Sequence, residues 1–269
     1  MVRVHSHDNY HCVNTEAGDE YSARALLLAT GSHYRRLDIP GEDDYIGAGV
    51  HFCATCDGPF YEGEHVAVIG GGNSAAEESV FLTRFASRVT LLVRDEALSA
   101  SQVLRDKVAS MDEIDLCTHT EAIAFRGEKA RLNTVVIEDN QNGDRSEIHP
   151  AGVFVFIGQQ PNSGFLEGSG VRRNRWGFVV TGHDLVHEED TPARYEAREP
   201  DFLETSVPGI FAAGDVRAGS TKQVVSAAGE GATAAPVAEG APHDGDRVSA
   251  ESGGGARRVR HGRAAPPAA

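Results

Sequence analysis

The 269-residue sequence predicts an α/β fold of about two domains. Short continuous apolar runs, typical of strands buried on both faces, alternate with segments whose apolar residues recur at helical spacing. A glycine turn, Gly70 to Gly72, joins one such strand to one such helix. This alternation is typical of parallel sheets covered by helices.

The expected elements follow in order along the chain. The N-terminal ones are polar, exposed strands over 1–20, a buried strand over 24–29, a loop over 32–49, a strand over 66–69, a helix over 74–86 and a strand over 89–93. The later ones are a helix over 103–111, strands over 132–138 and 147–157 joined by an Asn142-Gly143 turn, a strand over 209–213 and a helix from about Lys222. A tail over 236–269 is expected to be disordered, because it has too little apolar surface to offset the entropy of ordering.

Composition excludes several classes of function. The net charge of −15 argues against nucleic acid or an anionic membrane as partner. No apolar run reaches the ~18 residues of a membrane span, and the N-terminus lacks the pattern of a secretion signal. Four cysteines in a chain of this length do not indicate a disulfide scaffold. We therefore expect a cytoplasmic protein.

The segment Gly70-Gly71-Gly72-Asn73-Ser74-Ala75 fits the dinucleotide-binding pattern G-x-G-x-x-A. Gly70 would make the tight turn, Gly72 would let a pyrophosphate approach the backbone, and Ala75 would let the helix pack close to the strand. The N–H groups that open the helix, at Asn73 and Ser74, would hold the phosphate, which the helix dipole also favours.

The ribose is selected about twenty residues further on, at the end of the next strand. Arg94 there favours a 2′-phosphate, whereas Asp95 or Glu96 favours a free 2′-hydroxyl. The choice between NADPH and NADH stays open.

Cys53 and Cys56 form a Cys-x-x-Cys pair, a candidate redox dithiol. If Cys56 opens a helix, both sulfurs lie within bonding reach, and the helix N-terminus lowers the thiol pKa. Asp57 could exchange a proton during thiol–disulfide exchange. The alternative is half of a zinc site, but the remaining Cys12 and Cys117 are isolated in the sequence.

The histidines do not indicate a metal site. His5, His7 and His11 lie close together in the sequence, in a pattern that favours an exposed strand face. His51 is read as a loop residue rather than a ligand. No bound metal is expected.

Five motifs occur in a characteristic order: Ala29-Thr30-Gly31, Cys53-Ala54-Thr55-Cys56-Asp57, the Gly70–Ala75 turn, Ile157-Gly158-Gln159-Gln160-Pro161-Asn162, and Pro208-Gly209-Ile210-Phe211-Ala212-Ala213-Gly214-Asp215. In order and spacing, the chain from about Ala23 to Ala235 resembles the low-molecular-weight thioredoxin reductases. The resemblance implies two Rossmann-like, three-layer domains, with the NAD(P) domain inserted into the FAD domain.

The implied boundaries are 1–34 and 161–235 for the FAD domain, and 35–160 for the NAD(P) domain with its Cys pair. The interdomain hinges would be 32–37 and 158–162. FAD and NADPH are the implied cofactors, with NADH as the alternative. Thioredoxin or a similar small protein is the implied partner, and a homodimer is the implied assembly.

The resemblance also implies residue roles. Electrons would pass from the nicotinamide through FAD to the Cys53–Cys56 disulfide, with Cys56 facing the flavin, Cys53 attacking the substrate disulfide and Asp57 as acid catalyst. Asp215 would bind the ribityl chain, although by its own chemistry it could equally be a helix cap or turn residue. The other residues implied to contact a cofactor are Thr30, Gly31, Ile157, Gly158, Gly214, Lys222 and Gln223.

The sequence departs from the family pattern in three places. Nothing before Arg24 supplies the family's first G-x-G-x-x-G, so we expect an incomplete FAD domain with uncovered apolar strands around 26–28 and 210–213. Of the family's NADPH-selecting arginines only Arg94 is matched, and Pro236 is expected to interrupt the last helix. The alternative function is a non-catalytic nucleotide-binding fragment that holds no FAD, and a structural zinc protein ranks third. Relatives that reduce peroxiredoxin partners also stay open.

Overall fold

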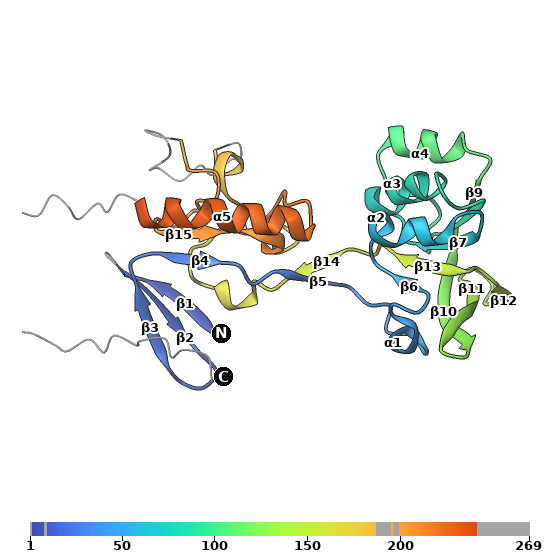
Figure 1. Cartoon of the computed structure of the whole chain (residues 1–269), viewed down its shortest axis with the longest axis horizontal. Coiled ribbons are helices and arrows are strands. Elements are labelled where there is room, and N and C mark those ends of the chain that lie inside the picture. Colours follow the sequence, from blue (N-terminus) through green and yellow to red (C-terminus); the bar gives the residue numbers. More distant parts are fainter. Residues whose placement is uncertain (1, 8–9, 187–194, 196–198, 241–269) are drawn as a thin grey trace, which may run out of the picture.

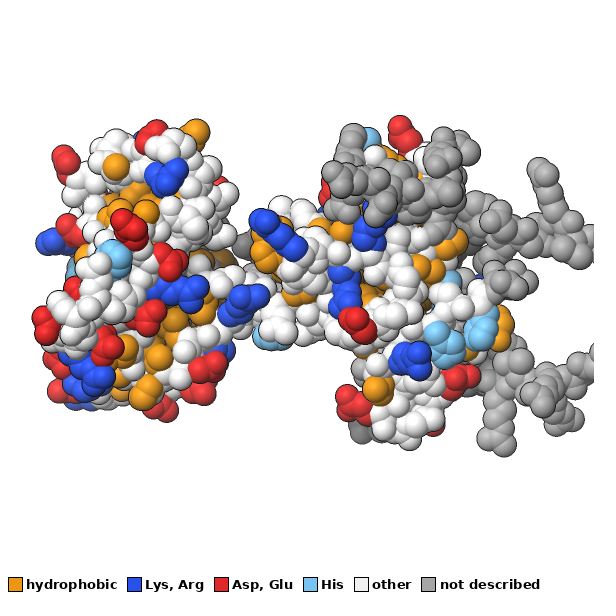
Figure 2. Space-filling model, turned by 180° about the vertical axis from the view of Figure 1, so that it is seen from behind, with side chains coloured by type: hydrophobic (Ala, Val, Ile, Leu, Met, Phe, Trp, Pro, Cys, Tyr) orange, Lys and Arg blue, Asp and Glu red, His pale blue; other side chains and the backbone are white. Residues whose placement is uncertain are grey.

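The computed structural model describes residues 2–7, 10–186, 195 and 199–240. These residues form two lobes joined by a narrow waist, which is visible from both sides (Figures 1 and 2). We call them the insert lobe, which runs from α1 to β13, and the terminal lobe, which contains both ends of the described chain. No helix among the described residues is long and apolar enough to cross a membrane.

The insert lobe has a five-stranded parallel sheet at its centre. In spatial order the strands are β6 (Val50–His51), β13 (Gly152–Val155), β7 (His65–Ile69), β8 (Arg88–Leu92) and β9 (Ile114–Cys117). One face carries α2 (Ala54–Asp57), η1 (Gly58–Tyr61), α3 (Asn73–Leu82) and α4 (Gln102–Ala109) (Figure 1). The other face carries the antiparallel strands β10 (Thr120–Glu128), β11 (Arg131–Asp139) and β12 (Arg145–Ile148).

Strand β7 shows why its sequence is apolar without a break. Val66 and Val68 pack into the core beneath the helices. Ala67 and Ile69 pack into the core beneath the antiparallel sheet. Because both faces of the strand are covered, alternation with polar residues is lost.

The terminal lobe repeats the three layers on a smaller scale. Its parallel pair is β4 (Leu26–Leu28) and β15 (Ile210–Ala212), covered by α5 (Val224–Gly240) on one side (Figure 1). The antiparallel strands β1 (Arg3–Ser6), β2 (His11–Asn14) and β3 (Glu20–Ala23) lie on the other side. The remaining short elements are η2 (Gly164–Leu166), η3 (Gly182–Leu185) and η5 (Gly214–Val216). The α/β fold class with parallel sheets is confirmed.

Two antiparallel strands, β5 (Ser32–Tyr34) and β14 (Gln159–Pro161), form the waist. The expectation of a loop over 32–49 is therefore wrong, because this segment holds β5 and also α1 (Glu42–Tyr45). The partner of β5 lies more than a hundred residues along the chain, so no local pattern reveals it.

The expected strand over 147–157 is two strands in different sheets, β12 and β13. Pro150 lies between them, and a proline has no N–H to continue a ladder. Strands β9 and β10 were not expected at all. The sequence of β9 shows neither strict alternation nor a continuous apolar run. In β10 the apolar run from Ala122 to Phe125 was an available signal that was not used.

The burial of several strands in the terminal lobe also differs from expectation. Val4 and Cys12 are buried, although polar, exposed strands were expected there. The expectation of an uncovered strand is wrong for β15, which is buried together with Ala213 because it pairs with β4 and packs against α5. On β4, Leu27 is 37% exposed.

Helix α5 continues through Pro236 to Gly240, so the expected interruption at Pro236 is wrong. A proline inside a helix costs about 3 kcal/mol, but α5 also contains six alanines, five of them before Pro236, and alanine has the highest helix propensity. Residues 241–269 of the expected tail lie outside the described residues.

Candidate functional site

Cys53 and Cys56 form a disulfide, with their Cα atoms 5.3 Å apart. The helix α2 begins at Ala54, so Cys53 is its N-cap residue and Cys56 lies in its first turn. The Cys56 N–H donates to Cys53 Sγ at 3.2 Å. A cysteine sulfur replaces the usual Ser or Asp oxygen as acceptor at the helix start. An N–H aimed at the sulfur stabilises a thiolate when the disulfide is reduced.

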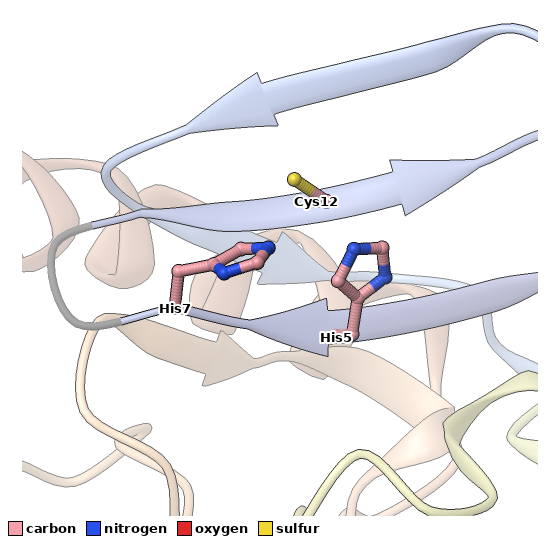
Figure 3. Close-up of side chains that lie close together, drawn as sticks. All are labelled: His5, His7 and Cys12. Carbon is pink, nitrogen blue, oxygen red and sulfur yellow. The ribbon is translucent and has the colours of Figure 1, made fainter.

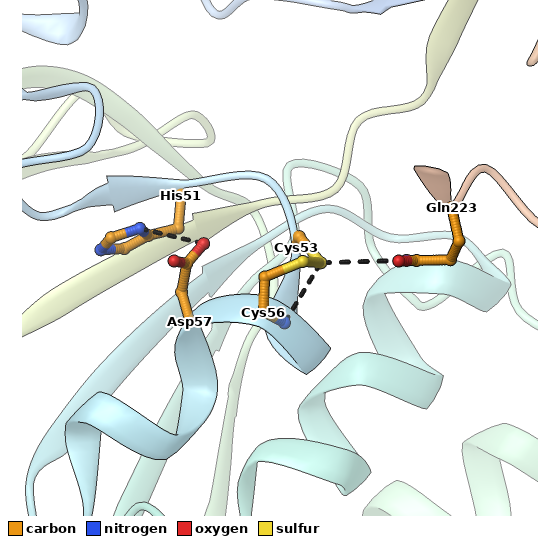
Figure 4. The surroundings of a disulfide bond; sticks show 5 residues. All are labelled: His51, Cys53, Cys56, Asp57 and Gln223. Carbon is orange, nitrogen blue, oxygen red and sulfur yellow. Dashed lines mark hydrogen bonds and ion pairs between the residues drawn. A yellow bond between two sulfur atoms is a disulfide. The ribbon is translucent and has the colours of Figure 1, made fainter. Parts of the chain in front are cut away.

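Asp57 ends α2 and is held by His51, which lies on β6 (Figure 4). His51 Nδ1 is 3.3 Å from Asp57 Oδ2, and His51 Nε2 is 2.6 Å from the Tyr61 hydroxyl. Burial lowers the pKa of His51, against the opposing effect of Asp57, and burial raises the pKa of Tyr61. The neutral tautomer that satisfies all three groups donates from Nδ1 to the carboxylate and accepts the tyrosine proton at Nε2.

His51 is therefore a candidate site residue, although its sequence context indicated only a loop residue. Its spacing two residues before Cys53 was visible in the sequence. Its contact with Tyr61 could not be predicted, because it depends on how η1 places the tyrosine hydroxyl beside β6.

The other lobe reaches the disulfide through Gln223. Its Nε2 donates to Cys53 Sγ at 3.9 Å, across 170 residues of sequence (Figure 4). The residue before it, Lys222, has a left-handed backbone with φ 57°. Lys222 Nζ donates to the Arg217 carbonyl at 2.9 Å and lies 4.3 Å from the centre of the Phe178 ring. Burial lowers the pKa of Lys222 to about 8, although Asp215 opposes the shift.

The glycine turn lies between β7 and α3, as the dinucleotide pattern requires. A Cβ on Gly70, whose φ is 148°, would lie 2.4 Å from the Phe156 carbonyl oxygen and 2.9 Å from the Ala75 Cβ. A Cβ on Gly72 would meet nothing within 4 Å. Gly70 thus makes the close turn, Ala75 has to be small, and the surface over Gly72 is open to a ligand.

The candidate residue Asn73 and the non-candidate Ser99 together hold the neighbouring loop in place beside this turn. The side-chain oxygen of Asn73 accepts the Ser101 N–H at 2.8 Å. Ser99 donates to the Gly71 carbonyl from both its N–H, at 2.8 Å, and its hydroxyl, at 3.0 Å. Ser74 is an exposed residue in the first turn of α3.

Arg94 follows β8, beside the turn, and its side chain is 75% exposed. Its Nε lies 3.7 Å from Asp95 Oδ1, so a carboxylate competes with any phosphate for the guanidinium. Its carbonyl accepts from Asn140 Nδ2 at 2.6 Å, which fixes the backbone but leaves the side chain in solvent.

In the terminal lobe, Gly214 and Asp215 form the turn η5 directly after β15. Gly214 has φ 74° and donates its N–H to Glu230 Oε2 at 2.6 Å. Arg217 pairs with the same carboxylate at 2.5 Å, and both side chains are more than 90% buried. Burial alone would raise the pKa of Glu230, but the hydrogen bonds from Arg217 and Gly214 outweigh it and lower the pKa.

This buried pair was missed by the sequence analysis. Glu230 is the only charged residue of α5 before Pro236, in a helix of small residues, and that contrast was the available signal. Asp215 itself has a buried Oδ1 that accepts no hydrogen bond from the described residues.

The remaining candidate residues lie in or beside the waist. Thr30 Oγ1 donates to the Asn162 carbonyl at 2.7 Å, and Asn162 Nδ2 donates to the Thr30 carbonyl at 2.8 Å. The Gly31 carbonyl accepts the Asn162 N–H at 2.9 Å. Gly158 has φ 99° and accepts the Arg35 N–H at 3.0 Å, while Ile157 packs into the insert lobe. The two chain segments that connect the lobes are thus hydrogen-bonded to each other.

The chain is similar in sequence and in fold to proteins that are already known. The sequence model of a family described as pyridine nucleotide-disulphide oxidoreductase matches residues 2–231. The thioredoxin reductase of Bacillus subtilis (strain 168) is 38% identical over 216 residues, which are 80% of this chain and 62% of that protein. The thioredoxin reductase of Treponema pallidum (strain Nichols) is 37% identical over 238 residues, which are 88% of this chain and 70% of that protein.

Among solved structures, thioredoxin reductase from Streptococcus pyogenes MGAS5005 aligns with a TM-score of 0.76 at 32% identity, over 88% of this chain and 71% of that one. The chain thus spans between about three fifths and three quarters of the length of these thioredoxin reductases.

Proposed function

Because this chain belongs to the pyridine nucleotide-disulphide oxidoreductase family, we propose that it is a flavin-dependent disulfide reductase acting on thioredoxin or a similar small protein. The observation that carries the proposal is the disulfide at the start of α2. It has the Asp57–His51 pair on one side and Gln223 of the other lobe on its Cys53 sulfur. We propose the boundaries 1–34, 35–160 and 161–235 for the two domains.

The terminal lobe fits the flavin cofactor. The buried, unpartnered Oδ1 of Asp215 is a suitable acceptor for a ligand hydroxyl, such as those of the ribityl chain of FAD. Gly214 belongs to the same turn, and Lys222 donates to the carbonyl of Arg217, which ends it; Gln223 follows Lys222 in the chain. When bound, FAD supplies two-electron transfer between a nicotinamide and a disulfide. Thr30, Gly31, Ile157 and Gly158 complete the proposed contacts at the waist.

The insert lobe fits the nicotinamide cofactor. Gly72 leaves open space, and the N-cap of α3 has no side-chain hydrogen bond, so the first N–H groups at Asn73 and Ser74 can bind a pyrophosphate. We propose NADPH as the cofactor, with Arg94 as the 2′-phosphate ligand. The carboxylate of Asp95 beside Arg94 keeps NADH as the alternative.

We propose that the Cys53 thiolate attacks the substrate disulfide, which breaks the substrate S–S bond and forms a mixed disulfide with one substrate sulfur. The Cys56 thiolate then attacks Cys53 Sγ, which re-forms the Cys53–Cys56 disulfide and releases that sulfur as the second substrate thiolate. The carboxyl group of Asp57 is the proposed proton donor to the first sulfur that leaves. The neutral His51 donates to that carboxylate, so it holds Asp57 in place without competing for the transferred proton. His51 is thus a positioning residue, and Tyr61 in turn orients its ring.

We further propose a homodimer in the cytoplasm, without nucleic acid or membrane partners, in keeping with the net charge of −15. The waist is proposed as the hinge about which the lobes rotate. In support, thioredoxin reductase from Lactococcus lactis, described as in its FR conformation, is also 32% identical but aligns with a TM-score of only 0.60. Similar sequences with different lobe arrangements would produce this result.

The first experiment is the visible absorption spectrum of the purified chain, followed by denaturation and assay of the released flavin. We expect near-stoichiometric FAD. A colourless protein would refute the reductase and favour the alternative, a nucleotide-binding fragment that holds no flavin.

The second experiment measures thioredoxin reduction with NADPH and with NADH. Cys53→Ser and Cys56→Ser should each abolish it, whereas Cys117→Ser, a change at a free cysteine of β9, should leave it intact. Activity retained in either of the first two variants would disprove the assigned thiol roles.

A further inference from the structure

A second group of metal-ligand side chains lies in the terminal lobe. His5 and His7 lie on and just after β1, and Cys12 lies on β2 (Figure 3). One ligand atom of each residue lies within 4.8 Å of the others. Figure 2 shows histidine side chains gathered on the surface of this lobe.

The strand register explains the cluster. His5 pairs directly with Cys12 across the antiparallel β1–β2 ladder. Two residues on, His7 points to the same face of the sheet as His5, because side chains alternate along a strand. In the sequence Cys12 looked isolated, because it belongs to no second Cys-x-x-Cys pair; its place beside the histidines depends on the register of β1 and β2.

Burial makes the three side chains suited to a ligand from solvent. Cys12 is 2% exposed, with its Sγ 3.4 Å from Ser22 Oγ, whereas His5 is half-buried and His7 is exposed. The His5 and His7 ring centres are 5.2 Å apart, and His7 stacks on Tyr10 at 4.5 Å. The Cys12 thiol is thus the buried ligand, and the two imidazoles are the ligands nearer to solvent.

We propose that His5, His7 and Cys12 bind a Zn²⁺ ion. Two imidazoles with one thiolate are a ligand set that zinc prefers. In a tetrahedral site with bonds of about 2.0–2.3 Å, ligand atoms lie roughly 3.3–3.8 Å apart. A closer approach of the three ligand atoms by about 1 Å therefore completes the set, and water takes the fourth position. Binding replaces the Cys12 proton, so one proton is released.

The site lies on the antiparallel sheet of the terminal lobe and needs no part of the proposed reductase chemistry. A bound ion would tie β1 to β2 where the chain reverses between them, and so stabilise the three-stranded sheet.

The experiment is a Co²⁺ titration of the full-length chain carrying Cys53→Ser and Cys56→Ser, which removes the redox thiols as competing ligands. Tetrahedral thiolate ligation gives cobalt an intense charge-transfer band together with visible ligand-field bands. We expect both bands to saturate at one equivalent and to vanish when Zn²⁺ is added. Absence of a saturable charge-transfer band would overturn the proposal.

Variants in the same background assign the ligands. Cys12→Ser should remove the charge-transfer band, and His5→Gln and His7→Gln should each weaken binding by at least about tenfold. Cys117→Ser and His149→Gln, matched changes outside the cluster, should leave the titration unchanged. A charge-transfer band that persists in Cys12→Ser, or that is lost in Cys117→Ser, would show that the metal binds elsewhere. If Cys12→Ser does not fold, His7→Gln still tests the site, because His7 is exposed and its substitution should not disturb folding.

Discussion

The buried ion pair between Arg217 and Glu230 offers a direct test of what stabilises the terminal lobe. Glu230→Gln keeps the shape of the side chain and removes its charge. Arg217 Nη2 and Nε lie 2.5 and 3.2 Å from the two carboxylate oxygens, and Gly214 N–H donates to one of them at 2.6 Å. The change therefore leaves a buried guanidinium without its anion.

The magnitude follows from this burial. Removing one partner of a buried pair costs about 3–5 kcal/mol, because the other charge stays desolvated. The glutamine oxygen still accepts one hydrogen bond, so we expect the lower end, about 3 kcal/mol. For a chain of this size that corresponds to roughly 6–12 °C in Tm. The η5 turn that carries Asp215 should loosen as well, and FAD affinity should fall.

Urea and thermal denaturation, followed by circular dichroism, measure the effect. The matched control is Glu147→Gln, which breaks the exposed Arg126–Glu147 pair and should cost at most about 1 kcal/mol. Because the pKa of Glu230 is lowered, the wild-type advantage is full above the ordinary glutamate pKa, and it should shrink as the pH falls below about 4. A loss below about 1 kcal/mol at pH 7 would refute the reasoning.

Three further outcomes are expected. Gly70→Ala should cost about 2 kcal/mol or more in urea denaturation, since its Cβ would strike a carbonyl oxygen, while Gly72→Ala should be nearly neutral; equal costs would contradict the turn geometry. Because the pKa of His51 is lowered, its contribution to stability is present above pH 6.5 and is lost as the pH falls through the lowered value, so His51→Gln should flatten the pH dependence of the unfolding free energy. NMR titration of Lys222 should give a pKa of about 8, and Asp215→Asn should lower it further, because Asp215 raises it; no change on that substitution would separate the two groups.

Local chemistry accounts for what could be predicted from sequence. The turn from Gly70 to Ala75 is recognisable because a positive φ and a close helix-to-strand approach demand particular small residues at fixed spacing. The Asn142-Gly143 hairpin between β11 and β12 was predicted for the same reason. The α/β class follows from strand β7, whose two buried faces leave a continuous apolar run.

What could not be predicted depends on residues far apart in sequence. The waist pairs Ser32 with Pro161, and the contact of Gln223 with Cys53 spans 170 residues. Neither leaves a periodic trace, because a hydrogen bond between distant segments constrains only the two residues that make it.

The sequence by itself therefore determined the fold class, the Cys53–Cys56 pair and the glycine turn between β7 and α3, because each depends on residues that are neighbours along the chain. Only the tertiary structure decided that His51 holds Asp57, that Glu230 anchors the turn carrying Asp215, and that Cys12 lies with His5 and His7. These arrangements depend on strand register and lobe packing. Both are set by burial of the whole chain rather than by the preference of any one segment.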